Sequence, residues 1–126
     1  MLARREFVGG SALALLAAGS PLSHGRIAGV EEMYGLIGQM KVLAEKRGEV
    51  IAALIEGTRD MPGNIAYMIA EDIEDATSIW ITEVWNTKTD HANSLQLPSV
   101  QEAISMARPY ITGFGTRVET KPVSRG

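Results

Sequence analysis

The chain of 126 residues contains no cysteine. This absence excludes a disulfide framework, a thiolate-ligated zinc or iron–sulfur cluster and a cysteine nucleophile. No apolar run reaches the roughly 18 to 20 residues that span a bilayer, so we expect no stable membrane anchor. The 12 lysines and arginines stand singly or in pairs within a net charge of -3, and they form no basic stripe. Nucleic acid is therefore not an expected partner.

Histidine is almost as scarce as cysteine, which limits the possible metal and imidazole chemistry. The chain has two histidines, His24 and His91, and neither stands at metal-ligand spacing from another histidine or from carboxylates. The acidic run at 71–75 is more typical of a solvated turn than of a calcium loop. We expect no metal site.

The N-terminus has the order of an export signal. Arg4 and Arg5 precede an uncharged apolar run from Phe7 to Ala18, and small or turn-forming residues follow. The paired arginines with the next three residues resemble the twin-arginine export motif. We therefore expect residues 1–25 to be a twin-arginine-type signal peptide and the protein to be periplasmic or secreted.

Residues 26–126 are expected to form one domain with its core at about 33–123, because the chain is 45% apolar and 21% charged. Alternation with period two and recurrence at helical spacing divide this part into strands and helices. The predicted strands are 33–42, 65–73, 78–86 and 114–121; the predicted helices are about 47–60 and two that open with capping-box spacing at Thr87 and Ser99. The order β-α-β-β-α-β predicts an α+β, ferredoxin-like fold, an antiparallel sheet with its helices on one face.

Two of the predicted strands are apolar on both faces. Tyr67 and Met68 alternate on the second strand, and Trp80 and Trp85 stand on opposite faces of the third. Helices on one side of a single sheet cannot cover both faces. We therefore expect a homodimer that buries the second face.

Three segments resemble the antibiotic biosynthesis monooxygenase family, including its quinol monooxygenase-like members. They are the turn and strand from Met61 to Tyr67, the triplet Glu83-Val84-Trp85, and the histidine-bearing segment from His91 to Val100. The resemblance implies a dimeric α+β barrel that oxidises a small aromatic hydroxy compound or quinol with O2, with no cofactor.

The resemblance also suggests which residues form the site. His91 is expected to be the catalytic base, because an imidazole titrates near neutrality and can take a hydroxyl proton. Trp85 offers a flat wall to an aromatic ring, and Tyr67 offers a hydroxyl to a quinol oxygen. Glu83 and Ser94 complete the expected substrate-binding set. Ser94 stands where the commonest version of the family carries its histidine.

Each of these residues also has a structural interpretation. His91 lies early in a helix, a common place for a solvated histidine, and Trp85 could serve only for packing. Glu83, if it is buried, must find hydrogen-bond donors or carry a raised pKa. Two other functions stay open: a non-catalytic dimer that binds a small hydrophobic ligand, and a haem-binding or haem-degrading protein with His91 as axial ligand. Haem-degrading relatives carry an asparagine on the first strand, where this chain has only Gln39.

Overall fold

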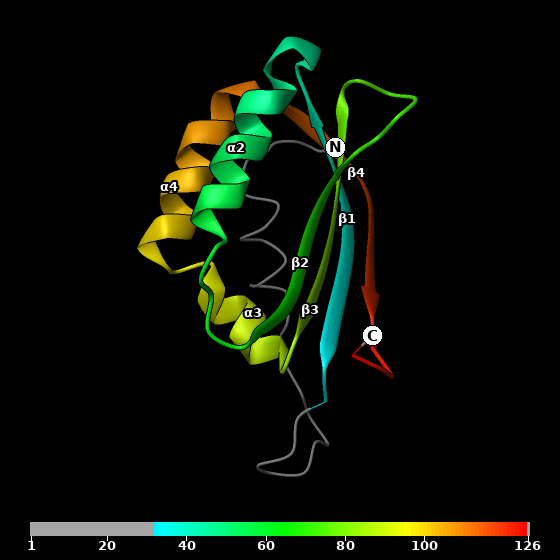
Figure 1. Ribbon diagram of the computed structural model, residues 1–126, viewed down its shortest axis with the longest axis vertical. Coiled ribbons are helices and arrows are strands. Elements are labelled where there is room, and N and C mark those ends of the chain that lie inside the picture. Colours follow the sequence, from blue (N-terminus) through cyan, green and yellow to red (C-terminus); the bar gives the residue numbers. More distant parts are fainter. Residues whose placement is uncertain (1–31, 126) are drawn as a thin grey trace.

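A computed structural model describes residues 32–125, so the predicted export signal lies outside the described residues. Figure 1 shows two layers, with the helices on one side and the sheet on the other. The elements, in chain order, are β1 (Tyr34–Val42), a 3-10 turn (Ala44–Lys46), α2 (Arg47–Gly57), β2 (Asn64–Glu71), β3 (Ser78–Trp85), α3 (Lys88–Ser94), α4 (Pro98–Ala107), a second 3-10 turn (Arg108–Tyr110) and β4 (Ile111–Thr120).

The sheet has four strands in the order β2-β3-β1-β4, and every neighbouring pair is antiparallel. This arrangement confirms the expected α+β, ferredoxin-like fold. Across the two central strands Leu36 of β1 pairs with Glu83 of β3. On the far side of β3, Tyr67 of β2 pairs with the same glutamate. Since paired residues share a face, these three side chains point to the same side of the sheet.

The second helical segment is divided into α3 and α4. Leu97, the residue before Pro98, has an extended backbone with ψ 135° and caps α4, whose first residue is the proline. Proline disfavours a helical residue before it but suits the first position of a new helix. The helix predicted to open at Ser99 therefore begins one residue earlier, and the expected capping box is wrong: Ser99 lies inside α4, which has no side-chain cap.

The other capping prediction is confirmed. Thr87 caps α3, and its hydroxyl accepts a hydrogen bond from the backbone N–H of Asp90 at 3.0 Å. Three element ends differ from the predicted ones by more than one residue. Helix α2 ends at Gly57, because Thr58 leaves helical geometry and bonds back to Leu54. Strand β2 ends at Glu71, and β4 starts at Ile111, three residues earlier than expected.

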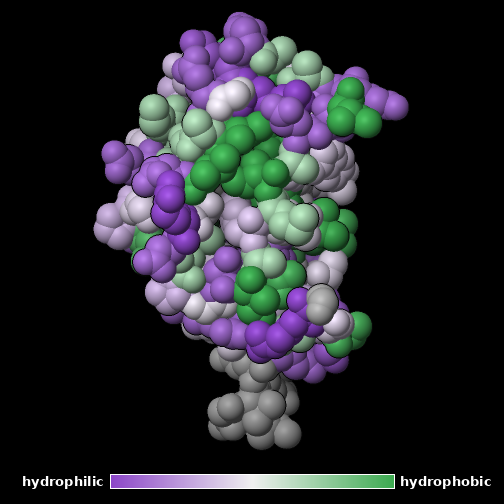
Figure 2. All heavy atoms as spheres, viewed as in Figure 1, coloured by the Kyte–Doolittle hydropathy of each residue, from purple (hydrophilic) through white to green (hydrophobic). Residues whose placement is uncertain are grey.

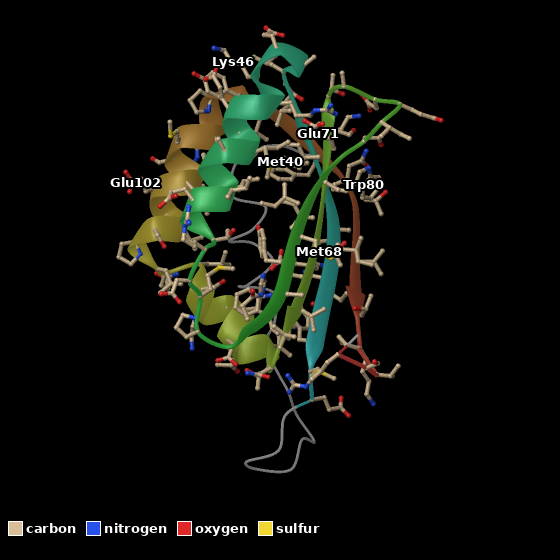
Figure 3. The ribbon with its side chains drawn as sticks, viewed as in Figure 1. Met40, Lys46, Met68, Glu71, Trp80 and Glu102 are labelled. Carbon is tan, nitrogen blue, oxygen red and sulfur yellow. The ribbon has the colours of Figure 1, made fainter. Side chains whose placement is uncertain are left out.

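Two apolar clusters fill the space between the layers. Figure 3 shows Met40 of β1 between the sheet and the helices, and Figure 2 shows apolar side chains gathered where α2 meets the sheet. The first cluster lies under α2 and the second lies near α3. The buried members of the first are Met40, Val42, Val50, Leu54, Ile79, Ile81 and Ala107. Those of the second are Tyr34, Leu36, Met61, Trp85, Leu95 and Val100.

The opposite face of the sheet carries no helix of residues 32–125 (Figure 1). Met68 and Trp80 lie on this face, pointing away from the helices in Figure 3. Met68 is 63% exposed and Val118 of β4 is 45% exposed. We name this the open face. Among the described residues, no helix is long and apolar enough to cross a membrane.

The acidic turn between β2 and β3 is held to the helical layer. The guanidinium of Arg47, at the start of α2, donates to the backbone carbonyls of Asp72, Asp75 and Ser78 at 3.1 to 3.2 Å. Asp75 also receives hydrogen bonds from Lys41 and Ser78, which hold the pKa of its carboxyl well below the usual range, together with those from Thr77. The hydrogen bonds to the Asp75 carboxylate therefore help to hold the turn between β2 and β3 in place.

Candidate active site

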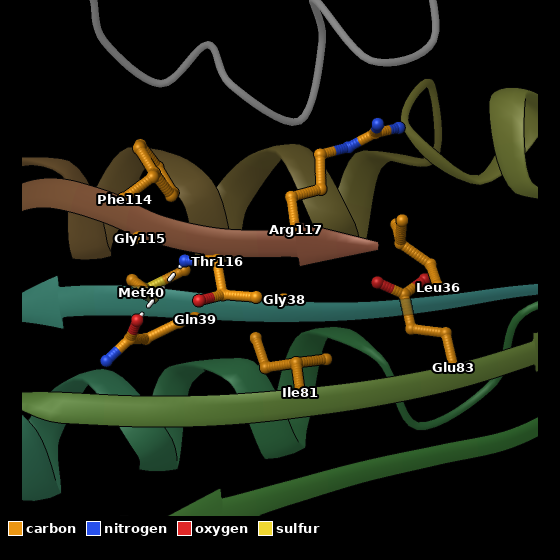
Figure 4. A pocket seen from close by; sticks show the side chains of 10 residues that line it. All are labelled: Leu36, Gly38, Gln39, Met40, Ile81, Glu83, Phe114, Gly115, Thr116 and Arg117. Atoms are coloured by element: carbon orange, nitrogen blue, oxygen red, sulfur yellow. Dashed lines mark hydrogen bonds between the residues drawn. The ribbon is translucent and has the colours of Figure 1, made fainter. Parts of the chain in front are cut away.

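A pocket opens on the helical side of the sheet, where β1, β3 and β4 meet (Figure 4). Its empty volume is about 460 Å³, a figure that includes space open to solvent. Alternation along β1 points Leu36, Gly38 and Met40 to this side. Its lining consists of Leu36, Gly38, Gln39, Met40, Ile81, Glu83, Phe114, Gly115, Thr116 and Arg117.

The floor of the pocket depends on Gly38. No atom of the described residues lies within 4 Å of the place where a Cβ on Gly38 would stand, so the missing side chain leaves open space. At the same place along β1, the pairing of β1 with β4 is irregular between Gly38 and Met40. Gln39 bridges this bulge, because its Oε1 accepts the backbone N–H of Thr116 at 3.2 Å. A glycine and a bulge together shape an apolar hollow in the sheet.

Glu83 is the buried carboxyl of the pocket, and it is only 5% exposed. Its Oε1 accepts a hydrogen bond from the indole Nε1 of Trp85 at 2.9 Å. Burial raises the pKa of Glu83 to about 7, against the opposing effects of the Trp85 hydrogen bond and the Arg117 charge. As a buried carboxyl, Glu83 is expected to find hydrogen-bond donors or carry a raised pKa, and in the structure it does both.

His91 lies next to Glu83 and is not among the residues that line the pocket. Helix α3 places it there, and it is 3% exposed, so it is not a solvated surface histidine. Its Nε2 has no hydrogen-bond partner among the described residues and lies 3.8 Å from Oε1 of Glu83. Burial lowers the pKa of His91 to about 4, helped by the charge of Arg117. The rings of Tyr34 and Trp85 pack against the imidazole, with centroids 5.4 and 5.7 Å away.

The pair formed by Glu83 and His91 can hold and move a single proton. Between the pKa of about 4 for His91 and that of about 7 for Glu83, both groups are neutral and the proton resides on the carboxyl. Near pH 7 the carboxylate starts to form and can accept a proton from a molecule in the pocket. The unpartnered Nε2 of His91 is a second possible proton acceptor, 3.8 Å from Oε1 of Glu83.

A charged group of side chains stands at the Glu83 end. Oε2 of Glu119 on β4 accepts from the Tyr34 hydroxyl at 2.7 Å and lies 3.2 Å from Nζ of Lys88. Nη2 of Arg117 approaches the same oxygen only to 3.5 Å. The hydrogen bond and these cations hold the pKa of Glu119 below its usual range, so the carboxylate stays ionised.

The structure brings together some of the residues that the sequence suggested. Glu83 lines the pocket, while His91 and Trp85 contact Glu83 and are not among the lining residues. Tyr67 is half-buried opposite Glu83, and burial raises the pKa of its hydroxyl. Ser94 is turned inward to its own helix, because its hydroxyl donates to the His91 carbonyl at 2.6 Å.

The sequence reading did not single out Arg117 or Glu119 as site residues. Both face the helical side from the last strand, at the registers opposite Gly38 and Leu36. The alternation of charged residues along 117–121 indicates one strand face but gives no register against β1, which runs about 80 residues earlier. Among residues 32–125, no three side chains of metal-ligating types come together.

Comparisons with known proteins identify the family and the fold. The family model for antibiotic biosynthesis monooxygenase matches residues 33–106. A protein from Chloroflexus aurantiacus J-10-fl, provisionally assigned as an antibiotic biosynthesis monooxygenase, has 47% sequence identity and a TM-score of 0.72, and the match covers 74% of this chain and 95% of that one.

More distant structures share the fold. A provisionally assigned antibiotic biosynthesis monooxygenase from Caulobacter crescentus CB15 has 14% identity and a TM-score of 0.68 over 75% of this chain and 92% of that one. Another from Nitrosomonas europaea has 18% identity and a TM-score of 0.64 over 77% and 96%. No protein of curated function matches the chain. On the family match and the 47% identity over most of both chains, this protein belongs to the antibiotic biosynthesis monooxygenase family.

Proposed function

We propose that the protein is a cofactor-independent monooxygenase that oxidises a small aromatic hydroxy compound or quinol with O2. One observation carries the proposal: an apolar pocket ends on Glu83, a buried carboxyl with a pKa near 7, and Glu83 is backed by the unpartnered imidazole of His91. A proton acceptor that titrates near neutrality in an apolar site suits removal of a hydroxyl proton. Membership of the family supports the reaction class.

The proposed reaction begins with proton removal. Loss of the hydroxyl proton makes the aromatic ring electron-rich, so that its anion can pass one electron to O2. The resulting radical and superoxide combine at a ring carbon as a peroxide anion. This anion takes back the proton held by Glu83 to become a hydroperoxide, and loss of water leaves a new carbonyl. One oxygen atom enters the product and the other leaves as water. The apolar lining stabilises the less solvated radical stage, while Glu83 accepts the proton.

The sequence suggests His91 as the base, and we propose a relay position for it. Its Nε2 lies 3.8 Å from Oε1 of Glu83, and Glu83, not His91, lines the pocket. In this proposal Glu83 takes the proton from the substrate and keeps it at rest, because its pKa of about 7 lies above that of His91, about 4, and the unpartnered Nε2 of His91 accepts the proton only in passing. Trp85 keeps Oε1 of Glu83 in place through the indole hydrogen bond. Substrate contacts come from the apolar lining residues and from Glu83.

We further propose that two copies of the chain pair through the open face. Met68 and Val118 lie there with 63% and 45% exposure. Burial of such apolar area contributes about 25 cal/mol per Å². A dimer of this kind leaves the pocket accessible, because the pocket lies on the helical side of the sheet. Export to the periplasm or the medium remains the proposal for the N-terminal segment.

The test is oxygen consumption by purified protein with a panel of quinols and anthrone-type aromatics. Wild-type protein is expected to consume O2 above the uncatalysed background with at least one of them. Glu83→Gln is expected to lose this activity, since the amide cannot accept the proton. Arg59→Gln, a change at an exposed position just after α2, serves as control. Binding of quinols without oxygen consumption, unchanged by Glu83→Gln, would support the ligand-binding alternative instead.

A further inference from the structure

Among the described residues, Arg117 is the one strongly basic side chain that lines the pocket. Figure 4 shows it rising from β4 toward the same end as Leu36 and Glu83, while Met40 and Phe114 line the other end. Its side chain is 33% exposed, so it borders the pocket and the solvent. An apolar body can lie along the Met40 side with a polar substituent at the Arg117 end.

The guanidinium of Arg117 retains most of its hydrogen-bonding capacity. A guanidinium has five N–H donors, and within residues 32–125 its one ionic contact is Glu119, at 3.5 Å. That carboxylate oxygen is already occupied by the Tyr34 hydroxyl at 2.7 Å and by Lys88 at 3.2 Å. Arg117 can therefore turn donors toward a ligand without breaking a short hydrogen bond.

The charges at this end of the pocket do not balance. Arg117 and Lys88 are cationic, and Glu119 is the one carboxylate that stays ionised below pH 7, because Glu83 is largely protonated there and His91 is neutral. The charge of Arg117 lowers the pKa of both Glu83 and His91, which places it near the proton-accepting pair. The group thus has one positive charge in excess, beside an apolar pocket.

We propose that Arg117 forms a subsite for an ionised ring oxygen, so that the preferred ligands are small aromatic compounds whose hydroxyl is in the anionic form once bound in the pocket. This inference rests on the proposed function, since it concerns the substrate of the same pocket. Arg117 then acts in substrate recognition: it holds the deprotonated oxygen next to Glu83, the group that removes the proton. A planar fork of N–H donors suits such an oxygen better than a single ammonium does.

The experiment uses two probes of matched size that are already quinones and cannot undergo the proposed oxidation. 2-Hydroxy-1,4-naphthoquinone is ionised at about pH 6, where Glu83 is mostly protonated, whereas 2-methoxy-1,4-naphthoquinone is neutral. Affinities are measured by calorimetry with the purified protein. The wild type is expected to bind the hydroxy compound about 10-fold or more tightly than the methoxy compound, the usual scale for a hydrogen bond to a charged group.

Arg117→Gln is expected to abolish this preference and to leave the affinity for the methoxy compound unchanged, which also shows that the pocket is intact. Arg59→Gln removes the same charge from an exposed side chain that does not line the pocket, and it should keep the preference. Equal affinity of the wild type for both probes overturns the proposal without any variant, and so does a preference that persists in Arg117→Gln. Neither outcome involves oxygen consumption, so this binding experiment and the test of the proposed monooxygenase activity can fail independently of each other.

Discussion

Replacing Glu83 with glutamine should change the pH dependence of folding stability. Burial raises the pKa of this carboxyl from an ordinary 4.5 to about 7, so the folded protein holds the proton more tightly than the unfolded chain. Stability contributed by a raised carboxyl pKa is fully present below 4.5 and is lost as the pH rises to 7. The complete loss corresponds to about 3 kcal/mol. Glutamine does not titrate and avoids this loss, and its carbonyl can still accept the Trp85 N–H.

His91 contributes with the opposite sign. Its pKa falls from 6.5 to about 4 on folding, so its contribution increases as the pH rises between these values. In the wild type the two groups largely cancel from about pH 4.5 to 6.5, and stability should be nearly level there. In Glu83→Gln only the histidine remains, and stability should rise through the same range.

The assay is urea unfolding followed by circular dichroism at a fixed protein concentration, from about pH 5 to 8. The stability of Glu83→Gln relative to wild type should increase by about 2 to 3 kcal/mol across this range. Glu102→Gln makes the same chemical change at an exposed position on α4 (Figure 3) and should show no such trend. Parallel pH profiles for Glu83→Gln and wild type would refute the assignment of a raised pKa to Glu83.

Four further predictions follow from the site, the open face and the N-terminus. His91→Ala should lower the turnover rate by roughly 100-fold or more with little change in ligand affinity, and a variant of wild-type rate would leave His91 with a packing role only. Trp85→Phe removes the donor to Glu83 at 2.9 Å, so the pKa of Glu83 should rise further and the pH–rate profile should move to higher pH; an unchanged profile contradicts this. Light scattering at micromolar concentration should give the mass of a dimer, and a monomer mass would disprove pairing through the open face. Changing both Arg4 and Arg5 to lysine should leave the protein uncleaved in the cytoplasm, and normal processing of that double variant argues against a twin-arginine route.

The fold was predictable because its signals are local. Alternation along 78–86 identifies β3, and the hydroxyl of Thr87 identifies the start of α3. The start of α4 was harder, because Ser99 offers a plausible cap while the restriction that Pro98 imposes on Leu97 decides the boundary. Residue spacing suggests candidate caps, but the backbone restriction imposed by a proline determines where the helix begins.

The sequence predicted only those site residues that lie on one strand and on the helix that follows it. Glu83 and Trp85 stand two residues apart on one strand face, so their proximity follows from the period of a strand. The burial of His91 depends on how α3 packs onto Tyr34 and Trp85, which the helix sequence does not specify. Arg117 reaches the pocket through the bulged pairing of β4 with β1, and no local pattern encodes that register.

Gly38 gives the pocket an adjustable depth. Since the space above its Cα is open, a side chain added there would grow into the cavity instead of colliding with a neighbour. Alanine, valine and leucine at this position would shorten the apolar hollow in graded steps, without removing Glu83, His91 or Arg117. The residue at position 38 therefore determines which size of aromatic compound fits. Related chains or engineered variants could change this selectivity through that one residue and keep the same proton chemistry.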